Sequence, residues 1–229
     1  LSDVDLLIID DFLTVGIDSD SASDLFAVLA NREHRLPTLI ASQSGPSYWV
    51  EALPDRVAAD SIVNRLAMQN NGYGVVVQSG DAVVTNNYLA FNPRSGVYVY
   101  DNATAIIINN TVFGNAFGGN TIDRDAAISL GLGGGSTIRN NIVTSNLFGV
   151  QCAGCTATID TNNVWGNTTN WAGDASAGTA NMNVDPVFVN VSGGNLRLQA
   201  VSPMIDAGSA VLAPNQDWDG LPRPSGAGV

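Results

Sequence analysis

The chain has 229 residues, of which 45% are hydrophobic and 13% are charged, as expected of a globular protein with one or two domains. Its net charge is −12, because 21 acidic residues oppose nine arginines and lysine is absent. Such a surface repels nucleic-acid phosphates, which disfavours DNA or RNA as a partner. No signal peptide leads the sequence and no apolar run is long enough to cross a bilayer, so we expect no membrane span.

Residues 1–67 predict alternating strands and helices. The run Leu6–Phe12 is typical of a buried parallel strand, and it carries Asp10 and Asp11 to the carboxyl edge of a sheet. A helix over residues 20–35 and a strand over residues 38–42 follow, and this strand brings Ser42 and Gln43 to the same edge. Two more helical segments are predicted near residues 47–53 and 58–67.

This order resembles the ATPase core of IstB-like transposition helper proteins, which are of the AAA+ type. The resemblance implies that Asp10 holds magnesium, Asp11 orients the attacking water, Ser42 and Gln43 read the γ-phosphate, and Arg65 reaches a neighbouring subunit. The Gly-rich phosphate loop and its lysine are absent from the chain. We therefore expect an incomplete ATP-binding segment without hydrolysis. The alternative is an ATP-binding transposition helper whose phosphate loop lies upstream.

Residues 62–70 can also be interpreted as the first unit of the repeat described next. In that interpretation Arg65 takes the place of a repeated asparagine, and Asn70 precedes Asn92 by 22 residues. We hypothesise that the chain joins parts of two genes and that the last ATPase segment covers the open end of a solenoid.

Residues 68–229 lack glutamate and are rich in Asn, Gly, Thr, Ala and Val, which indicates an all-β segment. One pattern recurs four times, namely apolar, any, Asn or Thr, Asn, any, apolar, any, any, Asn. Its copies are residues 84–92, 107–115, 138–146 and 159–167, with final asparagines 23, 31 and 21 residues apart. Short strands that recur with a period near 22 predict stacked coils.

A second strand is predicted before each copy, at residues 74–77, 96–99, 127–130 and 149–152. Alternation along residues 96–100 points Val97 and Val99 inward and Tyr98 and Tyr100 outward. One set of asparagines is expected to hydrogen-bond from coil to coil and to occupy left-handed corners; it comprises Asn87, Asn110, Asn141 and Asn162.

The 31-residue spacing predicts an insertion of about nine residues near Ala116–Asp125, relative to the period of such repeats. This loop contains Asp123, Arg124 and Asp125. It can be a solvated loop with a local ion pair, or it can bind a sugar acid or supply acid–base chemistry.

The two cysteines, Cys152 and Cys155, form a CxxC motif, which is compatible with metal or redox chemistry. Cys152 falls on the inward position of Val77 and Val99, so we expect a buried free thiol. A second CxxC for zinc is missing.

The repeat resembles the right-handed parallel β-helix of the pectate-lyase-like superfamily. The segments 185–188, 196–198, 202–208 and 217–224 resemble the closing part of secreted members. The resemblance implies coils over residues 68–184 and a closing segment over 185–229. The family includes polysaccharide lyases, glycoside hydrolases, epimerases and adhesins, so the fold alone does not fix an activity.

The expected fold is therefore mostly β, a right-handed parallel β-helix preceded by a partial α/β ATPase segment. The only histidine, His34, lies outside the repeat, which disfavours a polygalacturonase, and a calcium-dependent lyase would have to use Arg94, Arg124 or Arg139. We expect a scaffold of secreted or surface type that binds a polysaccharide or cell-surface glycan without intact catalysis. The alternative is a polysaccharide lyase or hydrolase that uses the loop 116–125.

The cofactors considered are ATP and magnesium for the first segment and calcium for the β-helix. The ATPase resemblance points to the cytoplasm and the β-helix to secretion.

Overall fold

A computed structural model describes residues 3–5, 7–9, 17–32, 38–40, 67–118, 125–178, 180–217 and 222–223. The chain divides into two compact units, residues 1–65 and 66–229. Within the described part, no helix is long and apolar enough to cross a membrane.

In the first unit, the predicted strand, helix and strand are present as β1 (Leu7–Ile9), α1 (Ser19–Arg32) and β2 (Thr38–Ile40). β1 and β2 pair in parallel, with Leu7 opposite Thr38. Asp18 caps α1, because its Oδ1 accepts the N–H of Ser21 at 2.8 Å. Hydrogen bonds from the backbone and from the side chain of Ser21 lower the pKa of Asp18.

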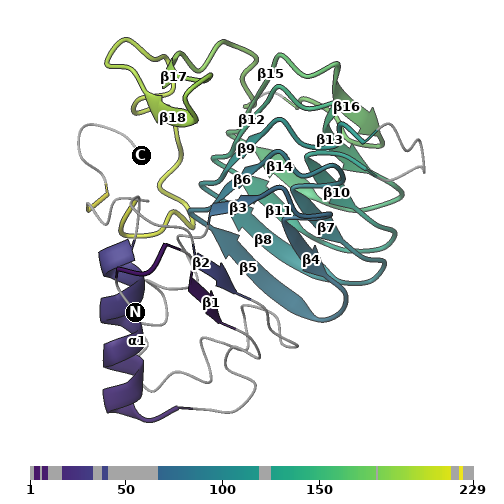
Figure 1. Ribbon diagram of the computed structural model, residues 1–229. Helices are drawn as coiled ribbons and strands as arrows, with labels where there is room; N and C mark the ends of the chain where they lie inside the picture. Colours follow the sequence, from purple (N-terminus) through teal and green to yellow (C-terminus); the bar gives the residue numbers. More distant parts are fainter. Residues whose placement is uncertain are drawn as a thin grey trace. The chain divides into compact units, whose positions relative to one another are not determined.

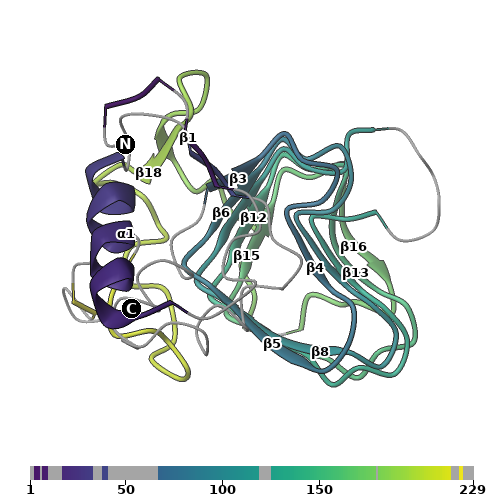
Figure 2. The ribbon, with the colours of Figure 1, turned by 60° about the horizontal axis from the view of Figure 1, so that its bottom comes forward.

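The second unit is a parallel β-helix of three sheets, each strand pairing in parallel with its counterpart one coil away. Sheet 1 contains β4 (Val75–Val77), β7 (Val97–Val99), β10 (Ile128–Leu130), β13 (Phe148–Cys152) and β16 (Thr169–Gly173). Sheet 2 contains β5 (Asp81–Thr85), β8 (Thr104–Ile108), β11 (Thr137–Arg139) and β14 (Thr158–Asp160). Sheet 3 contains β3 (Ala67–Gln69), β6 (Tyr88–Ala90), β9 (Thr111–Phe113), β12 (Ile142–Thr144) and β15 (Asn163–Trp165). Figure 1 shows the strands stacked in order, and Figure 2 shows the three sheets as the sides of one tube.

The interior of the tube is filled by columns of aliphatic side chains. In-register pairing places each inward residue over its equivalent in the next coil, as in the series Val84, Ile107, Ile138. The neighbouring column on sheet 3 runs through Leu89, Val112, Val143 and Val164, each of which is buried. No coil can bury this apolar face alone, so burial by stacking is what stabilises the fold.

Two buried asparagine ladders run along the edges of sheet 3. The predicted ladder of Asn87, Asn110, Asn141 and Asn162 is confirmed, since each side-chain Nδ2 donates to the Oδ1 of the next, at 2.9–3.0 Å. The final asparagines of the repeat form a second ladder, in which Asn92, Asn115, Asn146 and Asn167 are linked by Nδ2–Oδ1 contacts of 2.8, 3.1 and 2.8 Å.

The left-handed corners lie one residue before the ladder positions, which differs from the prediction. They are Asn86, Asn109, Asn140 and Thr161 on one edge, and Asn70, Phe91, Gly114, Ser145 and Gly166 on the other. The ladder asparagines themselves are absent from the positive-φ set. The amide of each is free to point inward because the preceding residue makes the turn.

The register of the repeat in the first coil is also one residue later than predicted. Asn92 Oδ1 accepts the backbone N–H of Asn71, so Asn71 and not Asn70 stands on the second ladder. Ala67, which was predicted to end a helix, is the first residue of β3 and pairs with Tyr88 of β6.

The C-terminal segment packs on the coils of the same unit. The antiparallel hairpin of β17 (Phe188–Asn190) and β18 (Asn195–Leu198) places Phe188 against Phe113 on the outer face of sheet 3, with ring centroids 6.3 Å apart. The chain then follows the corner between sheets 2 and 3. There Asn140 exchanges hydrogen bonds with Ser209, and Asn86 accepts one from Arg223.

Candidate functional site

Aromatic and charged side chains gather along one edge and the outer face of sheet 1. Tyr73, Arg94 and Phe117 each follow a ladder asparagine by two residues, so they lie at equivalent positions of consecutive coils. Tyr98 and Tyr100 come from β7 and the residue next to it. With Asp125 these residues are called the aromatic edge below; its members are Tyr73, Arg94, Tyr98, Tyr100, Phe117 and Asp125.

The three tyrosines of the aromatic edge form one contact series. The rings of Tyr73 and Tyr98 have centroids 5.5 Å apart, and those of Tyr98 and Tyr100 are 4.7 Å apart and perpendicular. Tyr98 is buried beneath its neighbours, whereas Tyr100 is 41% exposed. Val97 and Val99 point into the core as predicted, so the alternation along β7 places Tyr98 on the outer face.

Arg94 lies in the loop between β6 and β7 and joins the tyrosines to the insertion. Its guanidinium carbon lies 4.4 Å from the centroid of the Tyr73 ring, a cation–π contact. Its Nε donates to Asp125, with 3.1 Å to Oδ2. The Arg94 side chain is 40% exposed and that of Asp125 is 8% exposed, so the arginine lies at the surface and the carboxylate lies beneath it.

The protonation of this group follows from its packing. Burial raises the pKa of Tyr73, which the positive charge of Arg94 partly offsets. The hydrogen bond that Arg94 donates to Asp125 raises the pKa of Arg94 above its already high value. At neutral pH the tyrosine is therefore a neutral phenol and the arginine is a cation.

The predicted insertion is confirmed at its two ends. Thr111 of β9 pairs with Ile142 of β12 across 31 residues, and the extra residues lie between β9 and β10. The backbone N–H groups of Ala116 and Gly118 donate to the carbonyls of Arg94 and Pro93, which fixes Phe117 beside the coil below with 58% exposure. Asp125, at the other end, contacts Arg94.

Most of the predicted site residues lie outside the described residues. These are Asp10, Asp11, Ser42, Gln43, Arg65, Asp123 and Arg124. Of the loop cluster, the structure describes Asp125, and its partner is Arg94 of the preceding coil. Sequence analysis missed Tyr73 and Phe117, although their shared offset from the ladder asparagines was a usable signal.

Arg139, another predicted candidate, lies on the outer face of sheet 2. Its Nε and Nη2 donate to the two carboxylate oxygens of Asp160 at 2.5 and 2.6 Å, in register one coil apart. This hydrogen bonding lowers the pKa of Asp160 and raises that of Arg139. The pair braces two coils, and Arg139 also donates to the carbonyl of Val211 in the closing segment.

Among the residues that the structure describes, no three His, Cys, Asp or Glu side chains come together in a way that could hold a metal ion. Calcium takes six to eight oxygen ligands, which carbonyl groups can also supply, so the calcium considered from the sequence stays a prediction. The predicted magnesium ligand, Asp10, lies outside them.

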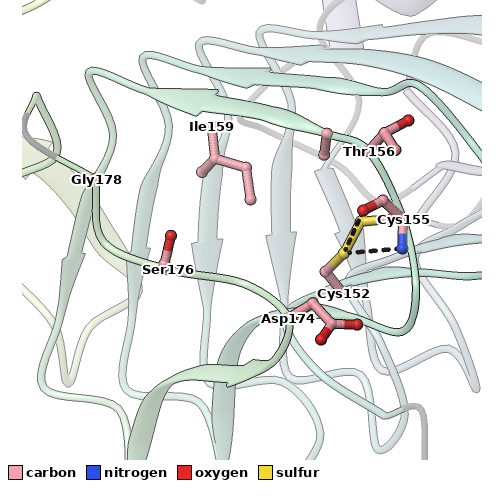
Figure 3. Close-up of a pocket in the computed structure, with 8 residues that line it drawn as sticks. Cys152, Cys155, Thr156, Ile159, Asp174, Ser176 and Gly178 are labelled. Atoms are coloured by element: carbon pink, nitrogen blue, oxygen red, sulfur yellow. Dashed lines mark hydrogen bonds between the residues drawn. A yellow bond between two sulfur atoms is a disulfide. The ribbon is translucent and has the colours of Figure 1, made fainter.

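The cysteines correct one expectation. Cys152 is inward and buried, as predicted, but its sulfur is bonded to that of Cys155, so neither is a free thiol. The pair lines a pocket of about 160 Å³ in the last coil (Figure 3). Ile159, Asp174 and Ser176 also line it.

Residues 56–186, more than half of the chain, match the family model for the right handed beta helix region. The chain belongs to this family. Its coils are therefore those of a right-handed β-helix, as the sequence predicted. No curated protein and no solved structure matches the chain. No comparison supports the ATPase resemblance of residues 1–67.

Proposed function

We propose that this right-handed β-helix protein binds a neutral polysaccharide along the aromatic edge and that the chain carries out no catalysis there. The observation behind the proposal is the contact series of three tyrosines that ends in the exposed ring of Tyr100. Arg94 contacts Tyr73 at the other end of this series, and Phe117 is exposed at the equivalent position one coil away from Arg94. Sugar rings offer apolar C–H faces and a rim of hydroxyls. Tyrosine and phenylalanine rings can stack on these faces, and a fixed guanidinium can donate hydrogen bonds to the hydroxyls.

The charges favour a neutral polymer over a polyuronate. The chain carries 21 acidic residues and nine arginines, so its overall field repels a polyanion. The cation of the aromatic edge is already compensated by Asp125. Arg94 donates to this carboxylate through Nε, and at 40% exposure its Nη groups remain able to donate to neutral hydroxyls.

The same contact argues against acid–base catalysis by Asp125. Its side chain is 8% exposed, and both carboxylate oxygens already accept from Nε of Arg94, so little of the carboxylate is open to a substrate. The lyase or hydrolase alternative would instead depend on Asp123 and Arg124, which lie outside the described residues. A calcium-dependent lyase assay on acidic glycans separates the two proposals.

The disulfide supports an extracellular or cell-surface location, because disulfides persist in oxidising compartments and are rare in the cytosol.

The test is affinity electrophoresis or calorimetry with neutral β-glucan, mannan and xylan, and with polygalacturonate as the acidic comparison. We expect binding to at least one neutral polymer, and a loss of roughly 3- to 10-fold in Tyr100→Ala, the worth of one aromatic contact. Tyr100→Phe keeps the ring and should bind as the wild type. Val83→Ala, an exposed position on sheet 2, is the matched control. Equal affinity of Tyr100→Ala and wild type, or preference for polygalacturonate, would contradict the proposal.

A second proposal concerns residues 1–65. The parallel pairing of β1 and β2 across α1 agrees with the strand–helix–strand order on which the IstB-like resemblance rests. The proposal is that this unit retains part of an ATP- and magnesium-binding site without hydrolysis. Calorimetry with ATP and magnesium tests it, and an absence of heat at millimolar ATP would end it.

A further inference from the structure

We propose that the Cys152–Cys155 disulfide is a reactive site for small uncharged or cationic thiols, which attack Cys155 and release Cys152 as the thiolate. The proposal is independent of polysaccharide binding, since it concerns the end of the tube and not the aromatic edge.

The disulfide lies where the aliphatic column of the core stops. Val77, Val99, Leu130 and Cys152 stand over one another on sheet 1, and the next residue in this register is Gly173 of β16. Gly173 has a φ of 63° and lies so close to the strand below that an added Cβ would be 2.1 Å from the carbonyl oxygen of Cys152. The last position of the column therefore carries no side chain, and no further layer covers Cys152 from this strand.

The space left over is a pocket large enough for a small organic molecule. Its volume of about 160 Å³ is close to that of cavities that hold a benzene-sized ligand. In Figure 3 the disulfide lies at one end of this pocket beside Asp174, while Ile159 and Ser176 lie farther away.

The two sulfurs differ in access. Cys152 is 3% exposed, whereas Cys155 is half-buried in the loop between β13 and β14. In the two coils below, the position of Cys155 is taken by Gly134 and Ala103, whose backbones contact in register. Ala103 is fully buried in the core, so Cys155 takes an inward position of the column. Cys155 is nevertheless partly exposed because it lies at this end of the tube, where a thiol can approach it. Disulfide exchange depends on which sulfur can be reached and on how well the leaving sulfur holds its charge.

The backbone is arranged to accept Cys152 as the leaving group. The N–H of Cys155 donates to Cys152 Sγ at 3.3 Å, a contact that strengthens when this sulfur becomes an anion. The carbonyl of Cys155 lies 3.5 Å from the same sulfur and can accept its S–H when the thiol is protonated. Both protonation states of a reduced Cys152 therefore have a partner already in place.

The reaction balances without another reactant. A thiolate forms a bond to Cys155 Sγ, the bond between Cys155 and Cys152 breaks, and its electron pair stays on Cys152 Sγ. The product is a mixed disulfide on Cys155 and a thiolate on Cys152. Attack by Cys152 on the mixed disulfide expels the thiol and restores the starting bond, while a second external thiol would oxidise to its own disulfide and leave both cysteines reduced.

Charge selects the thiol. Asp174 lines the pocket, with its Oδ2 accepting the N–H of Gly154 at 2.7 Å. The chain as a whole has a net charge of −12. An anionic thiol is repelled on both counts, whereas a cationic thiol is attracted.

The test uses cysteamine and 2-mercaptoethanesulfonate, which are similar in size and opposite in charge, on the folded full chain with iodoacetamide as the trap. Each rate is divided by that of the same thiol with a small soluble disulfide, which removes the difference in intrinsic reactivity. We expect peptide mapping to place the adduct on Cys155 and the alkyl group on Cys152. We also expect cysteamine to be favoured at least fivefold, and this preference to fall in Asp174→Asn. Asp101→Asn, a carboxylate in the turn after β7, is the matched control and should leave the preference unchanged.

Cysteine variants keep the proposal testable apart from folding. In Cys152→Ser the remaining Cys155 thiol should be trapped readily, and in Cys155→Ser the buried Cys152 should be trapped at least tenfold more slowly, with circular dichroism confirming that both variants are folded. Three results would overturn the proposal. They are an adduct on Cys152, reaction only after unfolding in urea, and equal normalised rates for the two thiols.

Discussion

Replacement of one ladder asparagine tests how much of the stability of the coils depends on these side chains. Asn115 is the most informative position, because it is fully buried in the middle of the second ladder. Its Oδ1 accepts the N–H and the Nδ2–H of Asn92, and its own Nδ2 donates to the carbonyls of Leu89 and Phe113 and to Asn146.

Asn115→Ala removes these five side-chain hydrogen bonds, including the acceptor that the backbone and the amide of Asn92 share. Each intramolecular hydrogen bond contributes about 0.5–1.5 kcal/mol, so we expect a loss of about 3–5 kcal/mol in the free energy of unfolding. Asn167 stands in the same ladder nearer its end and is only partly buried, so water can replace part of what Asn167→Ala removes. That variant should lose about half as much.

Urea unfolding followed by circular dichroism measures these losses, with exposed Asn215→Ala as the control, for which we expect less than about 0.5 kcal/mol. A loss of less than about 1 kcal/mol in Asn115→Ala, or equal losses in Asn115→Ala and Asn167→Ala, would show that the buried ladder contributes little to stability.

Three further predictions concern the ion pair, the last coil and the closing segment. Arg139 lowers the pKa of Asp160, so the carboxylate stabilises the fold above its unfolded pKa of about 3.9, and this contribution is lost as the pH falls through the lower folded value. In urea unfolding, the difference in stability between wild type and Asp160→Asn should therefore be larger at pH 7 than at pH 2. An equal difference at the two pH values would exclude the ion pair as its source. Gly173→Ala should lower the melting temperature clearly more than Gly178→Ala. Both glycines have positive φ, but the nearest atom to an added Cβ is 2.1 Å away at Gly173 and 3.6 Å away at Gly178. Similar shifts in melting temperature would show that the close approach of Gly173 to Cys152 is absent. Arg223 Nη1 donates to Asn86 Oδ1 at 2.9 Å, so a double-mutant cycle of Arg223→Ala and Asn86→Ala should give a coupling of about 0.5–1.5 kcal/mol, and zero coupling would mean that the closing segment does not hold this corner.

The sequence predicts the coils because the repeat is dictated by local stacking. A buried asparagine that recurs every 21–31 residues beside an apolar residue can pair with its own copy in the next coil, so the predicted ladder and the place of the insertion follow from spacing. The error at the first coil arises because residues 62–70 fit the pattern one position out of register. Asn70 makes the left-handed turn, and Asn71 is the ladder residue.

The remaining features depend on contacts that no local pattern encodes. The disulfide requires the inward Cys152 and the loop residue Cys155 to meet in the last coil, where the next residue of the column is Gly173. The closing segment is held at the corner between sheets 2 and 3 by a few hydrogen bonds between residues that are 69 and 137 positions apart in the sequence. Arg94 and Asp125 pair although the inserted loop lies between them in the sequence. The length of the loop alone could not show which of its charged residues would contact the coil.

Coils of unequal length stack at one constant rise in this β-helix, and distances between spin labels can measure that rise. Val83, Ile106, Thr137 and Thr158 stand in one register on sheet 2. Neighbouring strands are about 4.8 Å apart, so labels at Val83 and Thr137 should be about 10 Å apart at the Cα atoms, and labels at Val83 and Thr158 about 14 Å. We expect this even rise although one step spans 23 residues, the next 31 and the last 21. A distance that grows with sequence separation, or one above about 25 Å for Val83 and Thr158, would contradict a stacked β-helix.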